Sequence, residues 1–246
     1  MDITTERVEI SLPGGGAMGG YLARPTEGKR HPAVLVFMEI FGINSHIRDV
    51  NERVAREGYV ALAPDYFHRS GAGVEYGYDD DGFAKGMELL NQLDADEMVS
   101  DASAALEYLR DRSFVDGEKL GCMGFCIGGH MTYLAACETD VKAAASFYGG
   151  GIAAPEGPGG KPGTIGRTNK IKGRILCLFG EQDGFIPSDQ VTAVEAALKG
   201  AGTNHEVVVY PGADHGFFCD QRATYRKPAA EDAWERVKRL FSEELS

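Results

Sequence analysis

Short runs of consecutive apolar residues recur along this chain, and segments with helical periodicity separate most of them. The runs are AVLVF (33–37), YVALA (59–63), KLGCMGF (119–125), AAASFY (143–148), RILCLF (174–179) and EVVVY (206–210). Strands that are apolar on both faces are typical of a parallel sheet with helices on both sides. The pattern therefore predicts an α/β fold built on a mostly parallel sheet.

The N-terminal segment has a different pattern. VEISL and GGYLA alternate in polarity around PGGGAM, which predicts a β-hairpin. The glycines of this turn also match G-x-G-x-x-G, but a strand rather than a helix follows them, which disfavours a dinucleotide site. With the hairpin, about eight strands are expected, and we interpret residues 1–246 as one domain. Helices are expected over about 47–57, 95–112, 128–137, 189–200 and 228–242.

The charge of the chain excludes several classes of partner. The formal net charge is −12, whereas nucleic acid and anionic membranes require clustered Lys and Arg. The first residues, MDITTERVEIS, include acids and lack the apolar core of a signal peptide, and no apolar run is long enough to span a membrane. We therefore expect a cytoplasmic protein whose partner is a small molecule.

Cysteine and aspartate patterns give no sign of a metal site or a disulfide framework. The five cysteines include no C-x-x-C pair, so reduced thiols are expected, with Cys122, Cys137 and Cys177 as core residues. The run Asp79-Asp80-Asp81 lacks further ligands at calcium-loop spacing, and we expect a solvated loop there. No metal and no cofactor are predicted.

Cys126 stands in the sequence Gly-x-Cys-x-Gly, directly after an expected strand and before an expected helix. This is the nucleophile elbow G-x-S-x-G with sulfur in place of oxygen. A sharp strand-to-helix turn holds the nucleophile in strained backbone geometry, and the flanking glycines remove side chains that would collide. A buried structural thiol is the alternative interpretation of Cys126.

An acid and a histidine follow two later strands. Asp183 follows RILCLF, and His215 follows EVVVY. Ligands bind beyond the carboxyl ends of parallel strands, and nucleophile, acid, histidine is the chain order of α/β-hydrolases. Glu181 is the rival acid. His205 precedes its strand and therefore belongs to the opposite edge of the sheet.

These residue types suit acyl transfer. An imidazole can take the thiol proton, and a carboxylate fixes the imidazole tautomer. The developing oxyanion needs two donors. The amide of Ile127 follows the elbow, and the loop MEIFG after the first parallel strand offers the amide of Ile40.

The segments MEIFG, GFCIGG, GEQD and ADHGF, in this order and spacing, resemble the dienelactone hydrolase (carboxymethylenebutenolidase) family of α/β-hydrolases over about residues 5–242. The resemblance implies an α/β-hydrolase fold with Cys126, Asp183 and His215 as the triad. It also implies that Glu39 contacts the resting thiol and that Phe41 and Tyr148 line the pocket. We expect Phe217 to lie either in the pocket wall or in the core.

One departure from the family pattern concerns the substrate carboxylate. The best-known members hold it with two arginines, one ahead of the long helix and one four residues after the catalytic histidine. Cys219 stands at the second position, and residues 76–92 offer only Lys85. Arg222 is a substitute close in sequence. Both Lys85 and Arg222 are also compatible with a solvated role.

We therefore predict a cofactor-free hydrolase that opens dienelactone-type lactones through a thioester on Cys126. Another small ester or thioester is the alternative substrate. A non-catalytic, redox-sensing protein that uses Cys126 as an oxidisable thiol is the alternative function. We expect a monomer or a weak homodimer.

Overall fold

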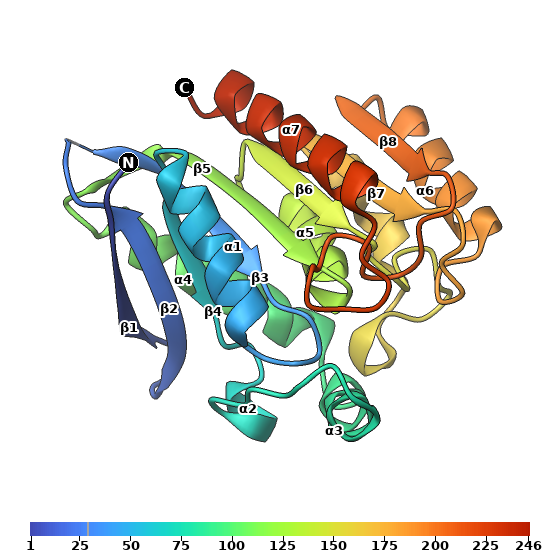
Figure 1. Cartoon of the computed structure of the whole chain (residues 1–246), viewed down its shortest axis with the longest axis horizontal. Helices are drawn as coiled ribbons and strands as arrows, with labels where there is room; N and C mark the ends of the chain where they lie inside the picture. The colour runs from blue at the N-terminus through green and yellow to red at the C-terminus, as the bar shows by residue number, and fades with distance from the viewer. Residues whose placement is uncertain (29) are drawn as a thin grey trace.

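The computed structural model describes residues 1–28 and 30–246, and within this part of the chain an eight-stranded sheet forms the centre of the molecule (Figure 1). The strand order is β1-β2-β4-β3-β5-β6-β7-β8. The first two strands form the predicted antiparallel hairpin, β2 joins β4 antiparallel, and all later pairs are parallel. The strands are β1 Ile3–Ser11, β2 Ala17–Pro25, β3 His31–Phe37, β4 Val60–Pro64, β5 Val115–Phe125, β6 Ala143–Phe147, β7 Arg174–Gly180 and β8 His205–Tyr210.

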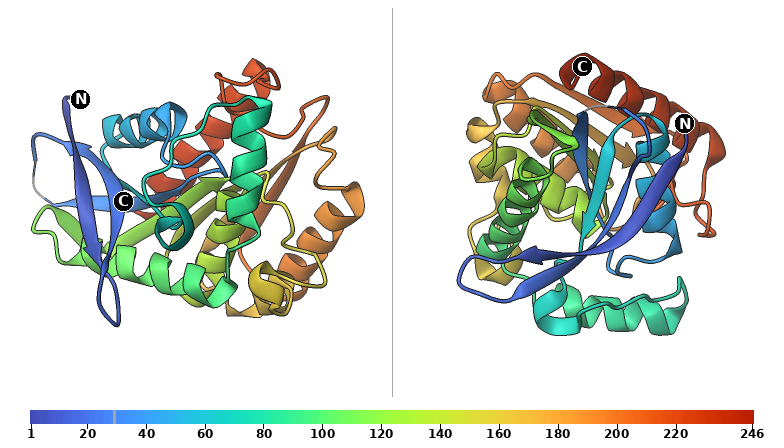
Figure 2. Two further views of the ribbon diagram at one scale, coloured as in Figure 1. Left: turned by 90° about the horizontal axis from the view of Figure 1, so that it is seen from below. Right: turned by 90° about the vertical axis from the view of Figure 1, so that its left-hand side faces the viewer.

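Helices cover both faces of this sheet. In Figures 1 and 2, α1 (Ser45–Arg56) and α7 (Lys227–Glu244) lie on one face, and α4 (Ala95–Arg110), α5 (Ile127–Glu138) and α6 (Ser188–Gly200) lie on the other. β4 and β6 are buried along their whole length, which is why their sequences are continuously apolar. The predicted parallel sheet with two helical layers is therefore confirmed.

Side-chain caps begin several helices where expected. Asn44 accepts a hydrogen bond from the Ile47 amide at the start of α1, and Asp94 accepts from the first amides of α4. Such caps satisfy backbone donors that have no partner inside the helix. α5 is different, because nearly every one of its residues is buried between the sheet and its neighbours. The elbow helix is therefore a core element.

The segment after β4 differs from the expected loop. It contains the short helix α2 (His68–Gly71) and the helix α3 (Asp80–Leu90), which lie below the sheet in Figure 1. The three acids at 79–81 are exposed, as expected, but they begin a helix and do not lie in a loop. Asp79 is the N-cap of α3 and accepts from the Gly82 amide at 2.8 Å, while the next two acids occupy its first turn. Negative charge there stabilises the positive end of the helix dipole.

The long connection between β6 and β7 contains two 3₁₀ helices, η1 (Pro158–Gly160) and η2 (Thr164–Lys170). η2 packs against α5 and α6. Among the helices of residues 1–28 and 30–246, none has the length and apolar character needed to cross a membrane. The connections at the carboxyl ends of the parallel strands form the region described next.

Candidate active site

The backbone at Cys126 is strained, as the elbow motif predicts. Its φ and ψ are 59° and −122°, and it lies between the end of β5 and the start of α5. A Cβ atom on Gly124 would lie 2.3 Å from the Gly128 carbonyl oxygen, and one on Gly128 would lie 2.4 Å from the carbonyl oxygens of Phe37 and Met38. Both flanking glycines are therefore required. Gly124 packs against the backbone of the elbow itself, and Gly128 packs against the backbone at the end of β3.

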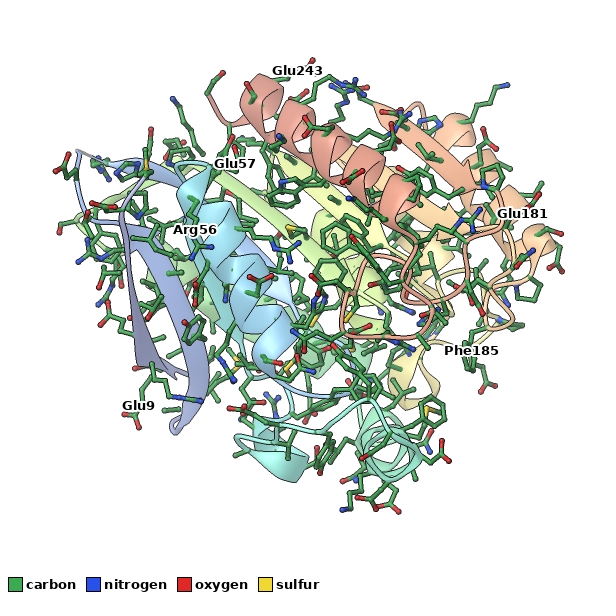
Figure 3. All side chains as sticks on the ribbon, viewed as in Figure 1. Glu9, Arg56, Glu57, Glu181, Phe185 and Glu243 are labelled. Atoms are coloured by element: carbon green, nitrogen blue, oxygen red, sulfur yellow. The ribbon has the colours of Figure 1, made fainter. Side chains whose placement is uncertain are left out.

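Asp183 and His215 form a close buried pair. The Asp183 Oδ2 lies 2.7 Å from His215 Nδ1, and its Oδ1 accepts from the Phe185 amide at 2.9 Å. The acid is thus fixed by its own loop and holds the ring with Nε2 as the free nitrogen. Glu181 instead accepts from the Gly212 amide and lies at the periphery of the molecule (Figure 3).

Charge and burial act against each other at His215. Burial disfavours the imidazolium, but the charge of a Cys126 thiolate, hydrogen bonds to Cys126 and Asp183, and the Asp183 carboxylate outweigh it and raise the pKa of His215 to about 10. With a pKa of about 10, the His215 ring is protonated across neutral pH. The structure brings the three predicted triad residues together at one edge of the sheet.

The two predicted oxyanion donors also lie at this site. Ile40 and Ile127 line the same cavity as Cys126 and His215. Neither amide donates to another protein group within the described residues 1–28 and 30–246. Two backbone amides without a hydrogen-bond acceptor, placed beside the Cys126 thiol, can donate hydrogen bonds to a carbonyl oxygen and stabilise the negative charge that develops on it.

Glu39 is fully buried and is directed to partners other than the thiol. Its Oε1 accepts from Arg222 Nη1 at 3.0 Å, and its Oε2 accepts from the Tyr78 hydroxyl at 2.9 Å. The Arg222 guanidinium also lies 5.7 Å from the ring centroid of Phe41. Within the described residues no hydrogen bond joins Glu39 to Cys126, because both carboxylate oxygens accept from Arg222 and Tyr78.

Two further potential metal ligands lie beside Glu39. Ligand atoms of Glu39, His46 and Cys219 lie within 4.8 Å of one another, and all three side chains are buried. Neither His46 nitrogen has a hydrogen-bond partner among the described residues, and burial lowers the pKa of this ring. Because Arg222 already neutralises the carboxylate, the cluster is organised around an ion pair, and we assign no metal to it.

A cavity of about 330 Å³ opens above Cys126. Its wall includes two of the residues expected to bind substrate, Phe41 and Arg222. Tyr148 is fully buried beneath it, with its ring centroid 5.0 Å from that of His215, and Phe217 packs behind Tyr148 at 5.3 Å. Lys85 is not brought to the cavity, because its ammonium binds Asp81 at 2.6 Å on the exposed side of α3.

Sequence reasoning missed the apolar wall that α3 provides. Phe83, Met87 and Leu90 recur at intervals of four and three residues, which places them on one face of the helix, and all three line the cavity. Phe185, after β7, completes this wall. The helical spacing was present in the sequence, but the glycines at 82 and 86 and the neighbouring acids obscured it.

Gly86 sets how closely α3 approaches the loop that carries Ile40. A Cβ atom on Gly86 would lie 2.7 Å from the Ile40 carbonyl oxygen and 2.9 Å from its Cγ1. We predict that Gly86→Ala lowers kcat about tenfold, because a shift of the Ile40 amide weakens one oxyanion donor, which is worth about 2.7–4 kcal/mol when lost completely. Steady-state kinetics with a 4-nitrophenyl ester measures this effect.

Gly200, the last residue of α6, is the matched control, because a Cβ there would meet open space. Alanine is favoured over glycine in helices by about 1 kcal/mol, so both substitutions receive the same intrinsic gain. Gly200→Ala should leave kcat unchanged. Equal kcat values for the two variants would contradict a positioning role for Gly86.

The parallel sheet, the elbow after β5, and the acid and histidine after β7 and β8 define an α/β-hydrolase. The comparisons with known proteins agree. The sequence profile of the dienelactone hydrolase family matches residues 18–245. The chain therefore belongs to the dienelactone hydrolase family, whose members hydrolyse ester and lactone bonds.

Individual relatives cover almost the whole chain. A Synechocystis protein named "Putative carboxymethylenebutenolidase" is 47% identical over 232 residues, which is 93% of this chain and 92% of the relative. An Escherichia coli K12 protein of the same name is 35% identical over 95% of this chain and 85% of its own length. The crystal structure of a dienelactone hydrolase homologue from Klebsiella pneumoniae superposes with a TM-score of 0.87 at 32% identity, covering 98% of this chain and 99% of the other.

Proposed function

We propose that the protein hydrolyses esters or lactones through a thioester formed on Cys126. One observation carries this proposal: the strained elbow presents the Cys126 thiol in a cavity beside a histidine that a buried aspartate holds at 2.7 Å. Thiolate is the nucleophilic form of cysteine, and a neighbouring imidazolium favours it. Dienelactone-type lactones are the first candidate substrates, because the curated relatives carry the name carboxymethylenebutenolidase.

The reaction follows in two halves. In the first half, the Cys126 sulfur attacks the carbonyl carbon, and the amides of Ile40 and Ile127 stabilise the oxyanion. The C–O bond of the ester then breaks, the alkoxide takes a proton from the His215 imidazolium, and a thioester remains. With a lactone, the alcohol produced stays attached to the acyl group.

In the second half, His215 accepts a proton from a water molecule as that water attacks the thioester carbon. The tetrahedral intermediate uses the same two amides, and its collapse breaks the C–S bond. The carboxylic acid leaves, and the sulfur departs as the thiolate paired with the imidazolium. Asp183 keeps the ring in the required tautomer throughout.

A panel of lactones and 4-nitrophenyl esters, tested on the wild type and on Cys126→Ala, checks the proposal. We expect turnover of at least one lactone or ester by the wild type and none above background by the variant. Mass spectrometry of the protein quenched during turnover should show one acyl group on the peptide that contains Cys126. An acyl group on another residue, or equal turnover by Cys126→Ala, would contradict the mechanism.

The same experiment separates the enzyme from the redox-sensing alternative. A sensor would form the acyl adduct once with an activated ester and would not release it. The described structure favours turnover, because a sensor thiol needs neither the two open amides at Ile40 and Ile127 nor the buried carboxylate of Asp183. Single acylation without release across the whole panel would support the sensor.

A further inference from the structure

One wall of the cavity is formed by apolar side chains of α3 together with Phe185. Met87 and Leu90 are partly buried, whereas Phe83 and Phe185 are 38% and 61% exposed. The ring centroids of these two phenylalanines lie 6.3 Å apart, and Phe185 also contacts the edge of His215 at 5.2 Å. Figure 3 shows Phe185 on the same lower side of the molecule as α3. The pair therefore lies across the entrance that a substrate must pass.

Large exposed aromatic side chains cost free energy in water, because their apolar surface stays hydrated. Five large hydrophobic side chains of the described residues are exposed, and two of the five meet at this one entrance. A substrate with an apolar group would cover both rings and gain the burial free energy that the free enzyme lacks. The exposed rings of Phe83 and Phe185 therefore favour the binding of an apolar group at this entrance.

The charged side chains of the cavity do not favour an anionic substrate. Arg222 is the cationic residue in its wall that carries a permanent charge, and Glu39 already binds it at 3.0 Å. Glu156 also lines the cavity, is exposed, and forms no ion pair within residues 1–28 and 30–246. A substrate carboxylate would have to compete with Glu39 for Arg222 and would also face the charge of Glu156.

We propose that the site selects uncharged esters or lactones that carry an extended apolar substituent, and that Phe83 and Phe185 determine this selectivity. This inference rests on the proposed function. It names an uncharged substrate class, in contrast to the carboxylate-bearing lactones that the family resemblance suggested. Each buried methylene is worth about fourfold in binding when fully covered, so the effect is large enough to measure.

The test uses two series of substrates and the full-length protein. The first contains the 4-nitrophenyl esters of acetic, butanoic and hexanoic acids, which vary the acyl side. The second contains S-methyl, S-butyl and S-hexyl thioacetate, which vary the leaving side at nearly constant leaving-group acidity. We expect kcat/KM to rise at least about tenfold from the shortest to the longest member of one series. A flat response in both series would overturn the proposal.

Phe83→Ala and Phe185→Ala should each lower the ratio of the longest to the shortest substrate about fivefold. Tyr225→Ala is the matched control, because Tyr225 is as exposed as Phe83, at 38%, and does not line the cavity. An unchanged ratio in both phenylalanine variants would overturn their role. Equal changes in the Tyr225 variant would do the same.

A charge-matched pair tests the second half of the inference. 4-Nitrophenyl hemisuccinate carries a carboxylate, and its methyl ester is neutral and slightly longer. We expect the neutral compound to be preferred at least about tenfold in kcat/KM, and Glu156→Gln to reduce this preference about threefold. Preference for the anion would overturn the proposal.

The outcome also separates this inference from the proposed function. If no member of either series is hydrolysed and no acyl group appears on Cys126, the hydrolase proposal itself fails. If all are hydrolysed through Cys126 with no dependence on chain length or charge, only the substrate class fails. The shortest member of each series has the least apolar surface to bury, so its turnover reports the chemistry with the smallest contribution from the apolar wall.

Discussion

Single replacement of Cys126, Asp183 or His215 is expected to lower kcat by about three orders of magnitude or more, as triad replacements do in hydrolases of this mechanism. Cys126→Ala removes the proposed nucleophile, His215→Gln removes the proposed base, and Asp183→Asn leaves the ring without the carboxylate at 2.7 Å that would fix its tautomer. Because the three act in one step, the double variant Cys126→Ala, His215→Gln should lose little more than either single variant. Steady-state kinetics on a 4-nitrophenyl ester provides all four values.

Glu181→Gln is the matched control for Asp183→Asn. Glu181 lies two residues earlier in the same loop, but it accepts from the Gly212 amide and stays at the surface. Its replacement should change kcat less than about twofold. Losses that add up in the double variant would contradict a shared mechanism, and a large loss in Glu181→Gln would reassign the acid. Circular dichroism confirms that each variant is folded.

Much of the framework could be predicted because it depends on local pattern. β4 and β6 are apolar on both faces, and only a central position in a covered sheet permits this. The elbow at Cys126 could be predicted because so tight a turn, with φ 59° at Cys126, leaves no room for side chains at 124 and 128. The sequence therefore has glycine at both positions. Asp183 and His215 followed from topology, since the ends of parallel strands meet at one edge.

Other parts of the site depend on contacts that no local pattern records. Arg222 and Glu39 are 183 residues apart, and only the fold brings them to 3.0 Å. The resemblance located Glu39 but placed it against the thiol, whereas the ion pair and the Tyr78 hydroxyl hold it elsewhere. α3 was not predicted because glycine has a low helix propensity, and Gly86 lies in the middle of this helix. The structure shows why a glycine is there: a Cβ atom at 86 would collide with Ile40.

Glu39→Gln is expected to increase the rate at which iodoacetamide alkylates Cys126 about tenfold near neutral pH. Glu39 and Arg222 form a compensating pair of charges beside the cavity that holds the sulfur. At an effective dielectric near 20, a unit charge 4–8 Å away is worth about 2–4 kcal/mol. Replacing the acid leaves the guanidinium uncompensated, and a positive charge near sulfur favours the thiolate.

Arg222→Gln is the matched variant of opposite sign. It leaves the fully buried Glu39 carboxylate uncompensated, and a negative charge near sulfur opposes the thiolate. Alkylation should therefore slow about tenfold, and the double variant Glu39→Gln, Arg222→Gln should return toward the wild-type rate. Changes of the same sign in the two single variants would contradict an electrostatic origin.

Alkylation reports Cys126 because the other four thiols are buried. Burial raises the pKa of Cys137 and of Cys219 to about 12, and it raises the pKa of Cys122 and of Cys177 above the usual range for a thiol. These thiols are protonated and covered at neutral pH. The Cys126→Ala variant supplies the background rate, which should be close to zero over the same period.

Despite its more reactive thiol, Glu39→Gln should hydrolyse esters about tenfold more slowly than the wild type. Arg222, released from Glu39, gains freedom to enter the cavity, whose wall it already forms. There it would obstruct an ester substrate more than the small reagent iodoacetamide. A variant that alkylates no faster than the wild type from pH 6 to 9 would show that Glu39 does not control the nucleophile.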